Sequence, residues 1–244
     1  MTDHEQHDKE AEENIKRVVE EHGWYVCKFL ATDYLPSFCY TIGLWKNYQH
    51  PELISFGLTT DTLHSILNIG GDLVRNGQKL KANTEYDDFF EQSSAMIIDV
   101  HERNLKDYFG YGIWYNEGDF PAMQIIWKDR YGKFPWEKRF DKNFIHWQPL
   151  LDRNFNFKYR EEKNLGVFTT RQHLELGEPI VRVYHDNDGD WQFLTGNQKL
   201  EDARIVSLEV MVQRDKTLNE LFNLEYGEFA ERNSPSDKWI RGKE

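Results

Sequence analysis

The sequence has little of what marks a secreted or membrane-bound protein. Its 244 residues include two cysteines, Cys27 and Cys39, in apolar, strand-like segments without a zinc-ligand spacing, whereas small secreted scaffolds carry many more. No apolar run approaches the roughly 18 residues of a membrane span, and the charged stretch from Met1 to Glu13 is unlike a signal peptide. We therefore expect a cytoplasmic protein with buried thiols and no membrane contact.

The sequence also lacks an excess of basic residues. Lysine and arginine number 30 against 42 aspartates and glutamates, which gives a net charge of -12. Both halves of the chain are acidic, so neither offers the basic surface that a nucleic acid requires. An acidic surface attracts basic proteins and speeds their encounter. Solubility alone is the other explanation of this charge.

Recognisable catalytic motifs are missing as well. The chain has no H-E-x-x-H, C-x-x-C or phosphate-binding glycine loop, and no serine lies in a G-x-S-x-G turn. Cys39 with a distant histidine is a conceivable nucleophile, but its apolar surroundings favour a buried thiol. We expect no cofactor, and the absence of these motifs argues against an enzyme.

What is present is an aromatic, strongly patterned chain with 15% aromatic residues. Residues 8–22 have helical spacing, and Gly23 is typical of a helix end. Short apolar segments predict strands, of which the first two should pair as a hairpin. These are 24–30, 38–44, 52–58, 96–101 and 123–127. Asp61 can cap a helix that carries apolar residues from Leu63 to Val74. The glycine-rich aromatic segment 108–115 is typical of a packed surface loop or an edge strand.

A second set of elements follows the polar segment 137–164, which we interpret as a connector. Further strands are predicted at 167–169, 180–184, 191–194 and 204–206, with helices beginning near Ser207 or Asp215. The turn from Asp186 to Gly189 predicts a β-hairpin. The sequence therefore predicts an α+β fold of two domains, residues 1–148 and 149–244, with mostly antiparallel sheets and a few flanking helices.

A series of short sequence motifs runs from His22 to Trp136. They are His22-Gly-Trp, Tyr40-Thr-Ile-Gly-Leu44, His50-Pro-Glu-Leu53, Gly57-Leu58, Asp99-Val-His101, Gln124-Ile-Ile-Trp-Lys-Asp129 and Gly132-Lys-Phe-Pro-Trp136. This half of the chain resembles the bacterial domain of unknown function 4262. The resemblance implies a bacterial cytoplasmic protein and implies no activity.

The region from Val167 to Leu221 resembles small domains found among bacterial toxin-immunity proteins. The matching words are Thr169-Thr170, Pro179-Ile180, Asp188-Gly-Asp-Trp-Gln-Phe-Leu194, Gly196 and Arg204-Ile-Val206. This second resemblance implies a partner protein, namely a cognate toxin.

Two pairs of histidine and carboxylate residues are the candidates for catalysis. His50 and Glu52 are two residues apart, and so are Asp99 and His101. In an extended chain each pair points to one face of its strand. Two such strands side by side could bind a divalent metal or perform acid–base chemistry. The alternative is structural, with His50 and Glu52 binding backbone groups in a turn, and with Asp99 and His101 paired to each other or to the next loop.

A cluster of aromatic residues is the candidate binding surface. Tyr108, Tyr111, Trp114 and Tyr115 lie close together in the sequence, and such side chains are favoured where proteins bind one another. They could equally fill the core.

Our leading hypothesis is an acidic protein-binding module of the immunity or antitoxin kind, which neutralises a basic effector. The competing hypothesis is an enzyme or metal-dependent protein that uses the four histidine and carboxylate residues.

Overall fold

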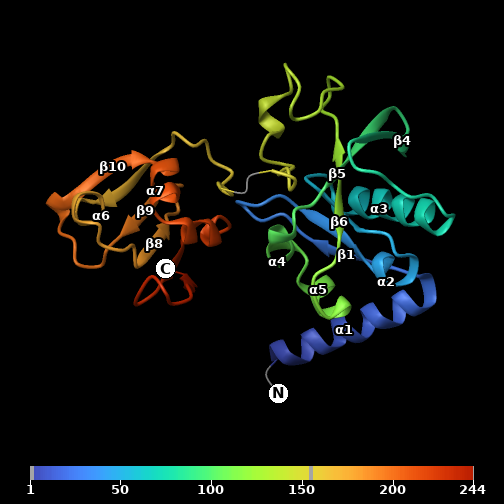
Figure 1. Cartoon of the computed structure of the whole chain (residues 1–244), viewed down its shortest axis with the longest axis horizontal. Coiled ribbons are helices and arrows are strands. Elements are labelled where there is room, and N and C mark those ends of the chain that lie inside the picture. Colours follow the sequence, from blue (N-terminus) through green and yellow to red (C-terminus); the bar gives the residue numbers. More distant parts are fainter. Residues whose placement is uncertain (1–2, 154–155, 244) are drawn as a thin grey trace. The chain divides into compact units, whose positions relative to one another are not determined.

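The computed structural model describes residues 3–153 and 156–243 and divides into two compact units. Unit 1 is formed by Met1–Ala31 and Pro36–Arg153, and unit 2 by Thr32–Leu35 and Asn154–Glu244. The boundary thus follows Arg153, whereas the sequence-based prediction placed it after residue 148. Each unit is built on its own six-stranded sheet (Figure 1).

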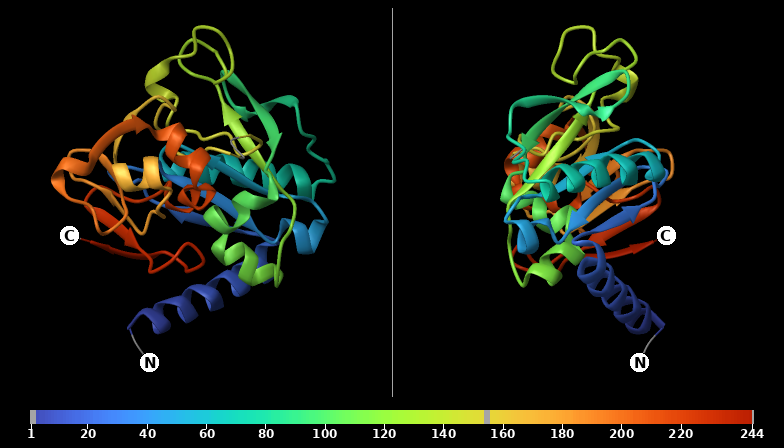
Figure 2. Two further views of the ribbon diagram at one scale, coloured as in Figure 1. Left: turned by 60° about the vertical axis from the view of Figure 1, so that its left-hand side comes forward. Right: turned by 90° about the vertical axis from the view of Figure 1, so that its right-hand side faces the viewer.

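Unit 1 combines six strands with short and long helices. Its strands are β1 (Tyr25–Phe29), β2 (Phe38–Ile42), β3 (Glu52–Phe56), β4 (Thr84–Phe90), β5 (Ser93–Asp99) and β6 (Ala122–Trp127). Its helices are α1 (Asp3–His22), α2 (Leu44–Tyr48), α3 (Thr60–Arg75), η1 (Glu102–Asn104), α4 (Leu105–Tyr108), α5 (Gly110–Asn116) and η2 (Lys142–Phe144). Figure 2 shows α1 as the longest of them.

The strands of unit 1 follow the order β1-β2-β3-β6-β5-β4. All neighbours are antiparallel except β3 and β6, which are parallel. The predicted pairing of the first two strands is confirmed, with Cys27 opposite Tyr40. Because unit 2 also combines helices with a mostly antiparallel sheet, the α+β fold class is confirmed.

Two apolar clusters cover the two faces of this sheet. On one face, Leu63, Ile66 and Leu67 of α3 pack against the strands. On the other face, Ile15 of α1 and Phe109, which joins α4 to α5, form a separate cluster with the strands. The sheet is therefore a central layer between α3 and the group of α1, α4 and α5.

Two glycines in the middle of α3 allow the helix to approach the sheet closely. A Cβ atom on Gly71 would come within 2.3 Å of Trp24, and one on Gly70 within 2.5 Å of Leu53. Glycine usually weakens a helix interior. Here its lack of a side chain is required by the close packing, so Gly70 and Gly71 lie within α3 without ending it.

The segment after β6 packs against unit 1, so its interpretation as a polar connector is wrong up to Arg153. Gln148 donates to the Trp127 carbonyl at 2.8 Å and accepts from the Trp127 amide at 3.2 Å. Leu151 is 3% exposed and donates its amide hydrogen to Gln124 at 2.9 Å. Two buried glutamines thus hold this segment to β6 although its composition is polar.

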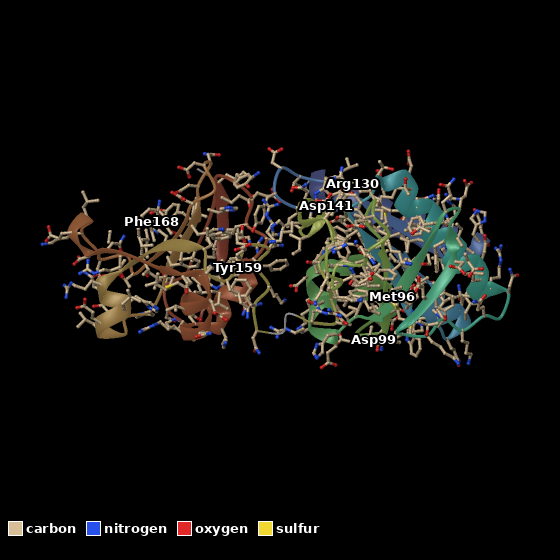
Figure 3. All side chains as sticks on the ribbon, turned by 90° about the horizontal axis from the view of Figure 1, so that it is seen from above. Met96, Asp99, Arg130, Asp141, Tyr159 and Phe168 are labelled. Carbon is tan, nitrogen blue, oxygen red and sulfur yellow. The ribbon has the colours of Figure 1, made fainter. Side chains whose placement is uncertain are left out.

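Earlier in the same segment, an ion pair and a carboxylate fix the turn that follows β6. Arg130 and Asp141, labelled in Figure 3, approach to 2.8 Å. Asp129 accepts backbone amide hydrogens from Tyr131, Lys133 and Asp141. These donors hold the pKa of Asp129 below its usual value, although desolvation opposes them.

Unit 2 repeats the combination of an open sheet with helices. Its elements are β7 (Gly166–Thr170), α6 (Arg171–Leu176), β8 (Arg182–His185), β9 (Trp191–Leu194), η3 (Leu200–Asp202), β10 (Ala203–Ser207), α7 (Leu208–Arg214), η4 (Lys216–Leu221), β11 (Glu228–Glu231) and β12 (Ile240–Lys243). The strand order is β10-β7-β9-β8-β11-β12. The predicted hairpin of β8 and β9 is confirmed, and Gly189 in its turn has a φ of 93°.

Several short elements were missed by the sequence patterns. These are α2, β4, α6, β11 and β12. β4 carries Glu85, Asp87 and Asp88, which obscure its strand character.

Among the described residues, no helix combines the length and the apolar character that crossing a membrane requires.

Candidate functional site

Glu52, a predicted catalytic residue, holds together the start of α2. Its side chain is 0% exposed. Its Oε1 accepts backbone hydrogens from Gly43 at 2.8 Å and Trp45 at 3.1 Å. Its Oε2 accepts from the Thr41 hydroxyl at 2.7 Å and the Leu44 amide at 3.2 Å. Glu52 therefore caps the amides that the first turn of a helix leaves unpaired.

The local sequence explains this arrangement. Gly43 has a φ of 116°, which glycine adopts readily, and so turns the chain sharply from β2 into α2. The Thr41 oxygen accepts the Leu53 amide hydrogen at 2.8 Å, and its own hydrogen points to Glu52. Burial raises the pKa of Glu52 to about 7, and the Thr41 hydroxyl and the backbone amides oppose that rise.

His50 is also committed to backbone partners. Its Nδ1 lies 2.8 Å from the Pro51 carbonyl oxygen, and its Nε2 accepts the Leu80 amide hydrogen at 3.2 Å. Because a carbonyl only accepts and an amide only donates, the ring is neutral with its hydrogen on Nδ1. Burial lowers the pKa of His50 in agreement with this state. His50 thus secures the segment that follows α3.

Asp99 and His101 lie elsewhere in unit 1. Asp99 is exposed at the end of β5 (Figure 3), and the exposed His101 accepts the Arg103 amide hydrogen at 3.3 Å at the start of η1. β6 lies between β3 and β5. Glu52 of β3 pairs with Ala122 of β6, and Asp99 of β5 pairs with Met123, the next residue of β6. Successive strand residues face opposite sides of a sheet, so Glu52 and Asp99 point to different faces.

The four predicted residues therefore do not form one group. Within residues 3–153 and 156–243, no three or more His, Cys, Asp or Glu side chains are arranged to hold a metal ion. Cys27 and Cys39 are both buried, and burial raises the pKa of each thiol to about 11. Neither thiol has the lowered pKa that favours a nucleophile.

The aromatic segment 108–115 is helical, which corrects its interpretation as a loop or an edge strand. Tyr108 ends α4, and Tyr111, Trp114 and Tyr115 belong to α5. Leu105, Phe109 and Ile113 recur every four residues and pack into the apolar cluster beneath. This helical period was present in the sequence, but the two glycines of α5 obscured it.

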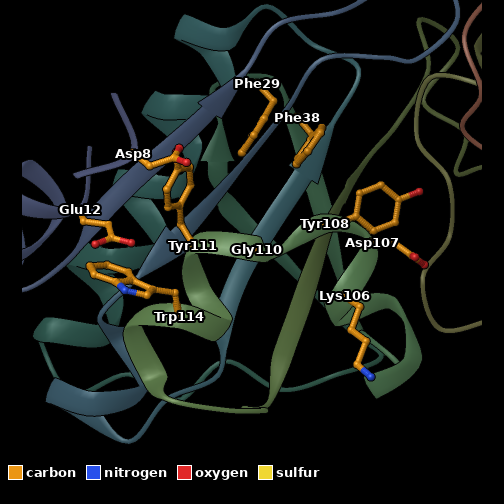
Figure 4. A pocket seen from close by; sticks show the side chains of 10 residues that line it. All are labelled: Asp8, Glu12, Phe29, Phe38, Lys106, Asp107, Tyr108, Gly110, Tyr111 and Trp114. Carbon is orange, nitrogen blue, oxygen red and sulfur yellow. The ribbon is translucent and has the colours of Figure 1, made fainter. Parts of the chain in front are cut away.

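Three of the four predicted binding residues line one groove of unit 1. The groove has a volume of about 480 Å³ and is bordered by Asp8, Glu12, Phe29, Phe38, Lys106, Asp107, Tyr108, Gly110, Tyr111 and Trp114 (Figure 4). Tyr115 is not among them. Its ring instead lies 4.8 Å from the Lys46 ammonium.

The apolar part of the groove comes from two neighbouring strands. Phe29 of β1 and Phe38 of β2 lie opposite each other, and their rings stack at 4.5 Å with an interplanar angle of 5°. Tyr108 meets Phe38 edge-on at 5.6 Å. All three rings are partly exposed, so the groove offers aromatic surface to a ligand.

The charged border of the groove is mainly acidic. Asp8, Glu12 and Asp107 contribute three carboxylates, against the Lys106 ammonium within the lining and the Lys16 ammonium beside Trp114. Figure 4 shows Tyr111 beside Asp8, and its hydroxyl donates to that carboxylate at 3.2 Å. Burial and the nearby Asp8 raise the pKa of Tyr111, so it remains a neutral donor.

A cation already lies against one aromatic ring of this border. The Lys16 ammonium lies 5.1 Å from the centre of the Trp114 ring, a distance at which a cation is attracted to an aromatic face. Aromatic faces beside carboxylates suit a lysine or arginine side chain, because the stem packs on the rings and the charge meets the acid. The acidic residues of α1 and the pair of phenylalanines were not predicted, although their charge and hairpin position are visible in the sequence.

Comparison with known proteins found one match. The family model described as a domain of unknown function (DUF4262) matches residues 18–141, which are 124 of the 244 residues. The matched segment includes β1, β2, α4 and α5, whereas Asp8 and Glu12 of α1 lie before it. A search of the curated proteins and a search of the solved structures found no match.

Proposed function

The chain belongs to the DUF4262 family, and we propose that it is a protein-binding module that takes a basic segment of another protein into its acidic aromatic groove. The specific role that we propose is that of an immunity or antitoxin protein, whose acidic surface neutralises a basic effector. The observation that carries the proposal is the meeting of three carboxylates with partly exposed aromatic rings in one groove.

The charge around the groove supports a basic partner. Residues Asp3–His22 of α1 include eight acidic and three basic residues, and the whole chain carries a net charge of -12. Acidic side chains at the border of an interface attract a basic partner over long range and raise its association rate. The aromatic rings would then supply the contact area that gives affinity.

The test compares two double variants of α1 in binding a short fluorescent peptide of alternating lysine and valine. Asp8→Asn with Glu12→Gln removes two charges from the groove. Glu10→Gln with Glu13→Gln removes the same charge from exposed positions on the same helix. We expect the groove variant to weaken binding by about tenfold or more, and the matched variant to weaken it by less than about threefold, as for exposed charges.

Equal losses in the two variants would show that the peptide responds to overall charge, and the groove would then have no special role.

The immunity role has its own test. Expression of the chain should restore the growth of cells that express a basic effector encoded beside it, and the groove variant should not. Protection by neither protein would contradict the immunity role.

A further inference from the structure

β1 ends the sheet of unit 1 and has one open edge. It pairs with β2 on one side and is the terminal strand of the order β1-β2-β3-β6-β5-β4. In an edge strand, alternate residues direct their N–H and C=O groups away from the sheet. Among the described residues, backbone hydrogen bonds of Tyr25–Phe29 run to β2, and none reaches another segment. Unpaired donors and acceptors are therefore available along β1.

The opposite edge of the sheet is more strongly protected than β1. β4 carries three carboxylates, and its register with β5 shifts between Tyr86 and Phe90. Charges and irregular pairing are the usual devices against unwanted strand addition. β1 has a continuous five-residue register with β2, and its one charged residue is Lys28. The two edges of one sheet thus differ in the features that decide whether a further strand can add.

Two grooves border β1. Phe29 lies in the acidic aromatic groove between α1 and α5. Tyr25 and Val26, near the other end of the strand, border a second groove of about 380 Å³ between α1 and α3. A strand added beside β1 would direct alternate side chains to these two faces.

The second groove offers different chemistry from the first. It is bordered by Val18, Val26 and the edge of Trp24, whose indole donates to Asn68 at 3.0 Å. The Arg75 guanidinium lies 5.1 Å from the Trp24 ring. Asp72 lines the same groove and pairs with Arg75 at 2.5 Å. Because the Asp72 carboxylate already has a cationic partner, the groove suits an apolar side chain better than a basic one.

We propose that the basic segment binds as an additional strand, hydrogen-bonded to the free edge of β1. This proposal rests on the proposed function. The backbone of the segment pairs with Tyr25–Phe29, which gives affinity independent of sequence. Its basic side chains, at every second position, reach Asp8 and Glu12 in the acidic groove. The residues between them point to the α3 side, where Trp24 and Val26 favour apolar side chains.

The experiment changes the peptide, because a proline placed in β1 could unfold unit 1. The peptide of alternating lysine and valine is made in two further forms, one N-methylated at every lysine and one at every valine. All forms have the same charge. Only one set of amides can face β1, so we expect one form to bind at least about tenfold more weakly and the other to bind within about threefold of the parent. Affinities are measured by fluorescence anisotropy with the unmodified full chain.

The possible failures are distinguishable. If the parent peptide binds through Asp8 and Glu12 and both methylated forms bind equally well, strand addition is overturned and the proposed function stands. If the parent peptide does not bind, the proposed function fails and the strand proposal falls with it. If sedimentation shows a dimer that excludes the peptide, the edge is occupied by a second copy of the chain, which also overturns the proposal.

Discussion

The Thr41 hydroxyl donates to the Glu52 carboxylate at 2.7 Å in a site closed to solvent. The contact joins β2 to β3 beside the first turn of α2, where three backbone amides also bind Glu52. Two residues from separate sequence motifs thus form one structural unit. The role of Glu52 is to satisfy buried donors, and the stability of unit 1 should depend on it.

We expect Glu52→Ala to lower the free energy of unfolding by about 3 kcal/mol or more, because it leaves several buried donors without an acceptor. Glu20→Ala, at an exposed position of α1, is the control and should change stability by less than about 0.5 kcal/mol. Urea denaturation followed by tryptophan fluorescence measures both. Similar midpoints for the two variants would contradict the capping role.

The pH dependence of stability should carry a contribution from Glu52. Burial raises the pKa of Glu52 from 4.5 to about 7 in the folded chain. The folded chain therefore holds a proton that the unfolded chain has already released between these values. This contribution to stability is complete below pH 4.5 and is lost as the pH rises through 7.

The comparison that isolates this effect uses Glu52→Gln, which cannot titrate. The free energy of unfolding of the wild type minus that of the variant should be larger at pH 5 than at pH 8. A difference that is constant or that grows with pH would show that the four hydrogen bonds outweigh burial and keep Glu52 ionised.

Close packing of α3 on the sheet makes a further prediction. A Cβ atom at Gly71 would lie 2.3 Å from Trp24, whereas one at Gly110 would meet nothing within 4 Å. Gly71→Ala should therefore cost about 1–3 kcal/mol relative to Gly110→Ala, since overpacking displaces the rigid indole. Thermal unfolding by circular dichroism measures both variants, and equal melting temperatures would mean that α3 can shift at no cost.

Two arginines of unit 2 should differ sharply in their contribution to stability. The Arg232 side chain is 1% exposed, and its guanidinium lies 2.6 Å from the Asp215 carboxylate. The guanidinium also stacks on the Trp239 ring, 4.1 Å from the ring centre. Arg232→Met should cost about 3–5 kcal/mol, because it leaves a largely buried carboxylate without its partner. Arg182 pairs with Glu231 in the open at 3.1 Å, so Arg182→Met should cost less than about 1 kcal/mol. Urea denaturation should give a clearly lower midpoint for Arg232→Met than for Arg182→Met. Equal midpoints would contradict the structural role of Arg232.

The hairpin turn of unit 2 tests a prediction made from sequence and now supported by geometry. Gly189 has a φ of 93°, which a β-branched residue adopts only with strain. Gly189→Val should lower the free energy of unfolding by about 1 kcal/mol or more. Asn187→Val, at an exposed position of the same turn, serves as the control. Equal losses of stability in both variants would contradict strain at Gly189.

The sequence by itself determined the features that depend on near neighbours. The end of α1 at Gly23, the pairing of β1 with β2 and the turn at Gly189 follow from residue spacing and turn chemistry, and all are observed. The acidic charge and the aromatic character of residues 108–115 are also local properties. A hairpin register or a helix end is fixed within a few residues, so the pattern of those residues is sufficient.

Only the tertiary structure decided which distant residues meet. β6 lies between β3 and β5 and sends Glu52 and Asp99 to opposite faces, so two similar sequence pairs stay apart. The groove joins Asp8, Phe29 and Trp114 from three elements. Strand order and helix placement depend on how the whole chain buries its apolar surface. That choice is made by long-range packing, which no local pattern records.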